Sequence, residues 1–158
     1  APGRLVVPDQ LVDYTWGRAH SFFDGDNASG ELADLEHIDF TEPYDAGLRA
    51  RLLRCAESLG LACASAGTYG VTQGPRLETA AEIRRLAGDG CDLVGMTGLP
   101  EASLAAELGL PYASLCIVVN PAAGLGDGPI TLESMQAVLE QGSQQVEALL
   151  SAFLQAPG

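Results

Sequence analysis

Short apolar runs alternate with amphipathic segments along this chain. Short apolar runs are typical of buried strands, and they predict strands at residues 4–12, 61–69, 91–95 and 112–119. Pro8 interrupts the first of these runs, and a proline inside a strand indicates an edge or a bulge. Strands that alternate with helices predict an α/β fold with a mixed central sheet flanked by helices.

Helices are predicted between and after these strands. The first begins at Thr41 and is closed by Gly60, with an apolar face that includes Leu48, Leu52, Leu53 and Leu59. The next two helices are expected at 79–86 and 100–109. The last helix is capped by Thr131 and has apolar positions at helical spacing, namely Leu132, Met135, Val138, Leu139, Val146, Leu149, Leu150 and Phe153.

Several loops between these elements are unusually polar. The segments 67–79 and 95–101 each follow a predicted strand and open a helix. Loops in this position can aim backbone N–H groups and side chains into one pocket, so they indicate a small-ligand site. The loop 14–39 is long, polar and aromatic, and the loop 120–129 is rich in glycine and proline.

Composition narrows the range of partners. A length of 158 residues with 47% hydrophobic and 18% charged residues fits one globular domain. The net charge of −13 and the absence of a basic run argue against nucleic acids and anionic membranes as partners. No apolar run reaches the roughly 20 residues that a membrane span needs.

The titratable side chains give little support for a metal or thiol chemistry. The four cysteines form no C-x-x-C pair, and we expect them to be buried free thiols in a reducing cytoplasm. The chain has two histidines and no clustered acids beside them, which argues against a zinc site and against a thiol nucleophile with its base. No G-x-G-x-x-G follows a strand, so a dinucleotide-binding domain is not favoured.

The motifs, in order and spacing, resemble the later two-thirds of the trimeric purine nucleoside phosphorylase family, on its methylthionucleoside branch. They are Val7–Gln10 with Asp13, Ser21–Gly25, His37–Ile38, Gly74–Thr79, Ala81–Glu82, Gly95–Thr97, Pro100–Glu101 and Val118–Gly124. The resemblance implies a nucleoside phosphorylase fold in a single domain and a cytoplasmic homotrimer. It implies inorganic phosphate as co-substrate and no cofactor or metal.

The family's first third has no counterpart here. That third carries the Gly-rich phosphate loop and an Arg/His pair for phosphate. We therefore expect residues 1–158 to be the C-terminal two-thirds of one nucleoside phosphorylase domain, without most of the phosphate ligands. An inactive nucleoside-binding fragment is the alternative from another functional class.

Glu78 and Asn120 are the expected catalytic pair. A 6-oxopurine carries a proton on N1, which a carboxylate at Glu78 can accept, and the Asn120 amide can bond to O6 or N7. Stabilising the departing purine anion would be the contribution of Asn120. Adenine has an unprotonated N1, so Glu78 would face a lone pair there. Without the motifs, Glu78 would be an ordinary first-turn helix acid and Asn120 a turn residue.

The resemblance assigns the remaining binding residues. Thr97 contacts phosphate, Met96 lies against the ribose, and Tyr69 lies near the ribose or the base. Leu77 packs on the purine face, and His37 reaches a neighbouring subunit's pocket near the 5′ end. Outside the family context these are ordinary cap, core or surface residues.

The residues expected near the 5′ position of the nucleoside distinguish a methylthio substrate from an ordinary nucleoside. Ordinary nucleoside phosphorylases of this family place a histidine near the start of the last helix, whereas this chain has Leu132 and Met135 there. An apolar, polarisable wall suits a methylthio group. The expected reaction is phosphorolysis of methylthioinosine to hypoxanthine and 5-methylthioribose 1-phosphate, a purine salvage step. Methylthioadenosine phosphorylase and general purine nucleoside phosphorylase remain the alternatives.

Overall fold

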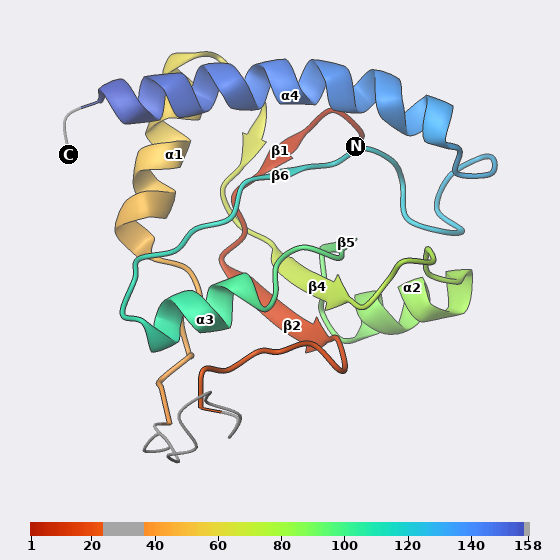
Figure 1. Ribbon diagram of the computed structural model, residues 1–158. Helices are drawn as coiled ribbons and strands as arrows, with labels where there is room; N and C mark the ends of the chain where they lie inside the picture. Colours follow the sequence, from red (N-terminus) through yellow and green to blue (C-terminus); the bar gives the residue numbers. More distant parts are fainter. Residues whose placement is uncertain (24–36, 157–158) are drawn as a thin grey trace.

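The computed structural model describes residues 1–23 and 37–156 (Figure 1). In this part of the chain, helices flank short strands, which confirms the α/β class. The helices are α1 (Ala46–Ser58), α2 (Ala80–Gly88), α3 (Glu101–Glu107) and α4 (Leu132–Gln155). The strands are β1 (Leu5–Val6), β2 (Gln10–Tyr14), β3 (Cys63–Ala64), β4 (Thr68–Thr72), β5 (Leu93–Gly95) and β6 (Cys116–Ile117).

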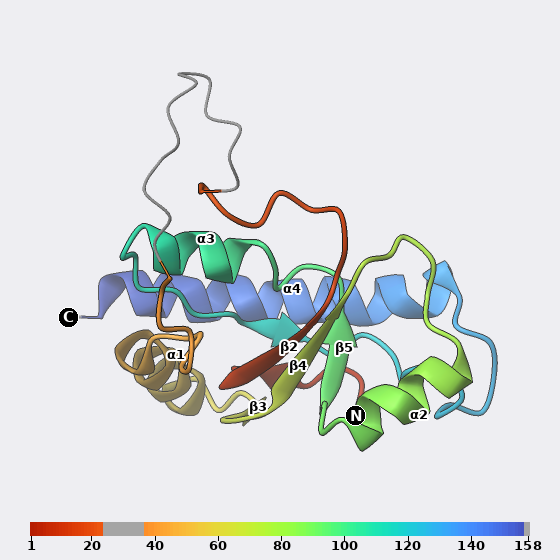
Figure 2. The same ribbon diagram turned by 90° about the horizontal axis from the view of Figure 1, so that it is seen from below.

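The described strands pair in two sheets of three strands each. One sheet has the order β3-β1-β6, with β1 parallel to β3 and antiparallel to β6. The other has the order β2-β4-β5, and all its strands are parallel. Figure 2 shows β2, β4 and β5 side by side with α4 crossing behind them. The expected mixture of parallel and antiparallel pairing is therefore present.

Two predicted strands each divide into two, because the chain passes from one sheet into the other. The first divides at Pro8, which is fully buried and has no N–H for a strand ladder. The neighbouring run divides between β3 and β4. The two crossings are tied together, since the Asp9 side chain accepts from the Gly67 N–H at 2.8 Å. The interruption at Pro8 was expected, but the change of sheet was not.

Side-chain capping explains where α1, α2 and α4 begin. Helix α1 begins at Ala46 and not at Thr41, because the Asp45 side chain accepts from the N–H of Leu48 at 2.7 Å. Thr41 instead donates its N–H to Asp39 at 2.9 Å in a turn ahead of the helix. Helices α2 and α4 begin directly after Thr79 and Thr131, whose side chains cap them.

The later apolar runs form shorter strands than expected. Of the run 91–95, residues Leu93–Gly95 pair with β4, and of the run 112–119 only Cys116–Ile117 pair with β1 within the described residues. Of the rest of the second run, Tyr112, Ala113 and Leu115 pack against the core, and Val118 exchanges backbone hydrogen bonds with Gly3 and Arg4 ahead of β1. The part of the polar loop that spans 24–36 lies outside the described residues.

Two buried clusters hold the elements together. One joins β1, α1 and α4 and consists of Leu5, Val7, Leu52, Cys55, Ala56 and Leu149. The other joins the parallel sheet to α3 and consists of Tyr69, Val71, Leu99 and Ala102. The four cysteines are free thiols, of which Cys55 is buried and the others are partly exposed.

The contact between α4 and β6 leaves no room for a side chain at Gly142. A Cβ at this position would lie 2.5 Å from Cγ2 of Ile117, a β-branched side chain that cannot turn away easily. We expect Gly142→Ala to lower the free energy of unfolding by about 1–3 kcal/mol, although alanine favours helix. Gly88→Ala is the control, because nothing lies within 4 Å of its Cβ position in α2. Chemical denaturation of both variants checks this, and an unchanged or raised stability of Gly142→Ala would contradict it.

Candidate active site

The parallel sheet brings the two polar loops to one edge. Strands β4 and β5 are neighbours, and Val71 pairs with Gly95. Segments 73–79 and 96–100 therefore leave the same sheet edge, at the carboxyl ends of their strands. In open α/β sheets this edge is where ligands bind.

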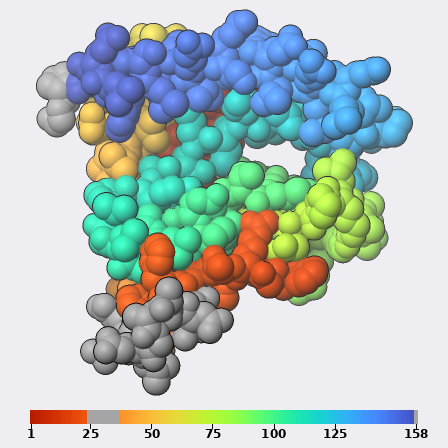
Figure 3. Space-filling view, viewed as in Figure 1, coloured from red at the N-terminus to blue at the C-terminus, as the bar shows by residue number. Residues whose placement is uncertain are grey.

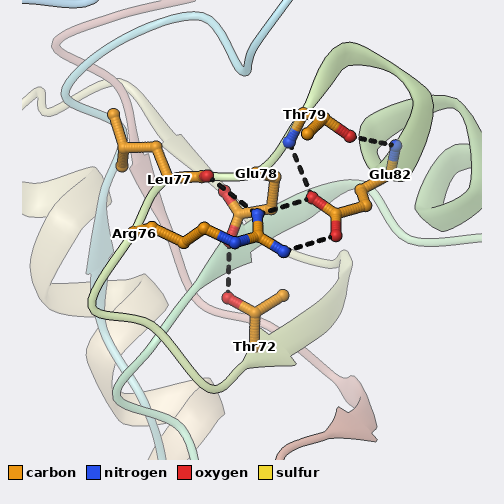
Figure 4. A network of polar contacts seen from close by, with 6 residues as sticks. All are labelled: Thr72, Arg76, Leu77, Glu78, Thr79 and Glu82. Carbon is orange, nitrogen blue, oxygen red and sulfur yellow. Dashed lines mark hydrogen bonds and ion pairs between the residues drawn. The ribbon is translucent and has the colours of Figure 1, made fainter.

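Glu78 is held by the last residue of β4. The Thr72 hydroxyl donates to Oε1 of Glu78 at 2.6 Å (Figure 4). It also lies 3.3 Å from the carbonyl oxygen of Gly95. A hydroxyl has one proton, so the shorter bond takes it. Sequence analysis missed Thr72. The available signal was a hydroxyl residue at the end of an apolar strand, six positions before the expected carboxylate.

The N-terminus of α2 has its own polar network, also drawn in Figure 4. Arg76 forms a bidentate ion pair with Glu82, with N–O distances of 2.8 and 2.7 Å. Glu82 also accepts from the backbone N–H of Thr79 at 2.7 Å, which completes a capping box. This capping box does not use Glu78, and within residues 1–23 and 37–156 the second carboxylate oxygen of Glu78 has no hydrogen-bond partner.

Tyr69 supports the second loop from beneath. Its hydroxyl accepts from the N–H of Thr97 at 3.3 Å and lies 3.3 Å from the Thr97 hydroxyl. The ring is 4% exposed, whereas Thr97 is exposed. A Cβ at Gly98 would lie 2.8 Å from the Tyr69 ring, so glycine is required for the loop to pass this close. The structure thus joins Tyr69 to Thr97 and presents Thr97 to solvent.

Met96 connects the two loops. Its sulfur packs against the Cα of Gly74, where a Cβ would collide with it. Gly74 also has a φ of +64°, which favours glycine. Leu77, on the same segment as Gly74, is 44% exposed. The predicted residues Glu78, Met96 and Thr97 are therefore carried by two segments that touch each other.

Asn120 begins the loop before α4. Its side-chain amide donates to the carbonyl of Pro121 at 2.7 Å, and it lines a cavity of about 190 Å³ formed by the loop and the first turn of α4. Gly124, with a φ of +80°, packs this loop against Ala80, two residues after Glu78. Figure 3 shows an opening in the molecule. Helix α4 and this loop form one side of it, and β5 and the segment around 72–79 form the other.

Two predicted residues lie apart from this arrangement. Leu132 is 83% exposed in the first turn of α4, and His37 is exposed at the start of the segment that precedes α1. Neither contacts Glu78, Met96 or Thr97 through a hydrogen bond within the described residues.

Within residues 1–23 and 37–156, no group of three or more His, Cys, Asp or Glu side chains could hold a metal ion. No helix of that part is long and apolar enough to cross a bilayer.

The profile of the Phosphorylase superfamily matches residues 1–155, and the chain belongs to this superfamily. A probable S-methyl-5′-thioinosine phosphorylase of Pseudomonas syringae pv. tomato is 51% identical over 154 residues, which are 98% of this chain and 61% of that protein. A 6-oxopurine nucleoside phosphorylase of Pyrococcus furiosus is 42% identical over 153 residues, 97% of this chain and 58% of that protein.

Solved structures show the same fold. Methylthioadenosine phosphorylase from Schistosoma mansoni in complex with adenine superposes with a TM-score of 0.88 at 27% identity, covering 96% of this chain and 58% of that one. The expected nucleoside phosphorylase fold is confirmed. The chain spans 61% and 58% of the two curated relatives described above.

The Arg76–Glu82 pair gives a test of the network in Figure 4. The pKa of Glu82 is lowered from its ordinary 4.5 to about 2. The larger cause is the hydrogen bond from Arg76, and the next is the hydrogen bond from the Thr79 backbone. We expect Arg76→Ala to raise the Glu82 pKa towards 4.5, measured by ¹³C NMR titration of the carboxyl group. Arg85→Ala is the control, because Arg85 pairs with Asp89 at 3.7 Å. A Glu82 pKa that Arg76→Ala leaves near 2 would contradict the assignment.

The same shift fixes a pH dependence. Because the folded-state pKa of Glu82 is depressed, its stabilisation is present above pH 4.5 and is lost as the pH falls through about 2. The difference in melting temperature between the wild type and Glu82→Gln should therefore narrow over this window.

Proposed function

We propose that the protein containing this chain catalyses phosphorolysis of S-methyl-5′-thioinosine to hypoxanthine and 5-methylthioribose 1-phosphate, a step of purine salvage. The proposal places residues 1–158 as the C-terminal two-thirds of a single nucleoside phosphorylase domain. Its support is the membership of the phosphorylase superfamily and the names of relatives that are 51% and 57% identical.

The observation that carries the choice of base is the carboxylate of Glu78. The Thr72 hydroxyl donates to one of its oxygens at 2.6 Å, and among the residues that the structure describes nothing donates to the second oxygen, which can accept a hydrogen bond from a ligand. A 6-oxopurine offers N1–H to such an acceptor, whereas the bare N1 of adenine would repel it. Asn120, on the loop packed against the start of α2, supplies an amide for O6 or N7.

The reaction needs positioning and charge stabilisation. An oxygen of inorganic phosphate attacks C1′ of the nucleoside while the C1′–N9 bond breaks through an oxocarbenium-like state. The bond electrons pass to the purine, which takes up a proton and leaves as hypoxanthine. Thr97 offers its hydroxyl and its loop backbone to the phosphate, and Asn120 stabilises the purine anion. The proposal uses phosphate as co-substrate and no organic cofactor.

The rest of the site is assigned within the same proposal. Met96 lies against the ribose, Tyr69 lies near it, and Leu77 packs on the purine. Leu132 lies near the methylthio group, and a neighbouring subunit of a cytoplasmic homotrimer contributes His37. The exposure of Leu132 and His37 agrees with a position at a pocket that one copy of this chain does not close.

Base preference tests the assignment of Glu78. In the complete gene product, we expect kcat/KM for methylthioinosine to exceed that for methylthioadenosine by at least about a hundredfold. Asn120→Asp should shift preference towards methylthioadenosine, and Glu78→Gln should erode the preference for the oxo base. Glu57→Gln, which makes the same change at an exposed position of α1, is the control. Equal or reversed kcat/KM values in the wild type would overturn the choice of substrate.

A second candidate is a general 6-oxopurine nucleoside phosphorylase. The Pyrococcus furiosus relative with that name, at 42% identity, favours it. Inosine separates the two candidates, because turnover of inosine equal to that of methylthioinosine would favour the general enzyme. Binding of hypoxanthine without any turnover would favour an inactive nucleoside-binding protein.

Assembly gives an independent test. We expect light scattering of the complete gene product to show a trimer, with Phe22 or Phe23 near a subunit interface. Phe22 is 48% exposed, and Phe22→Ser should weaken the assembly because it removes apolar area from that interface. Leu59→Ser is the matched control, since Leu59 is 43% exposed at the end of α1. Monomers at all concentrations would contradict the proposal.

A further inference from the structure

Arg18, in the loop after β2, inserts its guanidinium between the two polar loops. Among the described residues it donates to backbone carbonyls of both loops. These are Thr72 at 3.1 Å and Gln73 at 3.1 Å from Nη2, and Met96 at 3.0 Å together with Leu99 from Nη1. Its Nε also donates to the Gln73 side-chain oxygen at 3.2 Å. Both arms of the guanidinium are used, one on each loop.

Carbonyl dipoles hold this cation. Within the described residues, the salt bridges join Arg76 to Glu82 and Arg85 to Asp89, and none involves Arg18. A planar guanidinium has five N–H donors in a fixed fork, so the distance between its two arms sets the distance between the pair of carbonyls on one loop and the pair on the other. A lysine ammonium is a single point with no such fork, and it cannot hold both loops at a fixed spacing.

The carbonyls that Arg18 contacts flank the proposed ligand-binding groups. The Thr72 hydroxyl holds Glu78, while the Thr72 carbonyl accepts from Arg18. Thr97 lies between Met96 and Leu99, whose carbonyls accept from the other arm. One side chain therefore spans the base acceptor and the phosphate donor of the site.

The position of Arg18 is itself fixed. The side-chain oxygen of Gln73 accepts from Nε of Arg18 and also from the backbone N–H of Trp16 at 3.1 Å. The charge of Arg18 also acts on Tyr69 of β4, whose hydroxyl contacts Thr97 of the second loop. Burial raises the pKa of Tyr69, and its hydrogen bonds to Thr97 and the charge of Arg18 act in the opposite direction. A positive charge here favours an anion beside Thr97 in a chain of net charge −13.

We propose that Arg18 is a positioning residue that sets the spacing between Glu78 and Thr97, and so couples recognition of the purine to recognition of phosphate. The inference rests on the proposed function for the identity of the ligands. The coupling of the two loops rests on the hydrogen bonds alone.

The test uses the complete gene product with Arg18→Lys and Arg18→Ala, and with Arg54→Ala as the control at an exposed position of α1. We expect both Arg18 variants to lose about 10- to 100-fold in kcat/KM, because small misplacements of reacting groups cost this much. Free guanidinium ion at non-denaturing concentrations should restore part of the activity of Arg18→Ala, and ammonium should not. Arg54→Ala should behave as the wild type. Wild-type kcat/KM in Arg18→Lys, or no rescue by guanidinium, would overturn the proposal.

Hydrogen–deuterium exchange separates this inference from the proposed function. Exchange should accelerate in both segments 73–79 and 96–100 of Arg18→Lys, while α1 and α4 keep their protection. This result would support the coupling of the loops even if the wild type showed no phosphorolysis. Unchanged exchange in both segments, or loss of protection throughout the chain, would overturn it.

Discussion

The parallel pairing of β4 with β5 is the constraint on which the site depends. Its register places Val71 opposite Gly95, so the chain leaves both strands at one edge. The segments that follow carry Glu78 and Thr97. The chain enters this sheet by crossing from the other sheet between β3 and β4. The first strand makes the same crossing at Pro8, between β1 and β2. The bond from the Gly67 N–H to Asp9 joins these crossings. Strand β4 follows directly after the second crossing, and the segment with Glu78 follows β4.

Much of the fold was predictable from local signals. Thr79 and Thr131 are placed before amphipathic segments, and both cap the helices that follow. The division of two predicted strands was not predictable, because an apolar run does not reveal which sheet each residue joins. The start of α1 was also misplaced, since Thr41 and Asp45 are both good capping residues and only the Asp45 side chain caps the helix.

The site divides in the same way. Glu78, Met96 and Thr97 were predicted as site residues from motifs, a prediction that the fold leaves open, and they lie on two segments that touch each other. Thr72 and Arg18 were missed, because their roles arise from long-range hydrogen bonds. Arg18 bonds to carbonyls 54 to 81 residues away. Backbone carbonyls have no sequence signature, so an arginine that binds them looks like any polar loop residue. Residues that set spacing are thus harder to predict than residues that contact a ligand.

The central claim is that the loops after β4 and β5 form one site, with the base on Glu78 and phosphate on Thr97. A crystal structure of the complete gene product with hypoxanthine and phosphate tests it most directly. The expected distance from N1 of hypoxanthine to the Glu78 carboxylate oxygen that does not accept from Thr72 is about 2.7–3.2 Å. Phosphate is expected to contact the Thr97 hydroxyl. Hypoxanthine bound elsewhere, or phosphate bound away from the 96–100 segment, would contradict it.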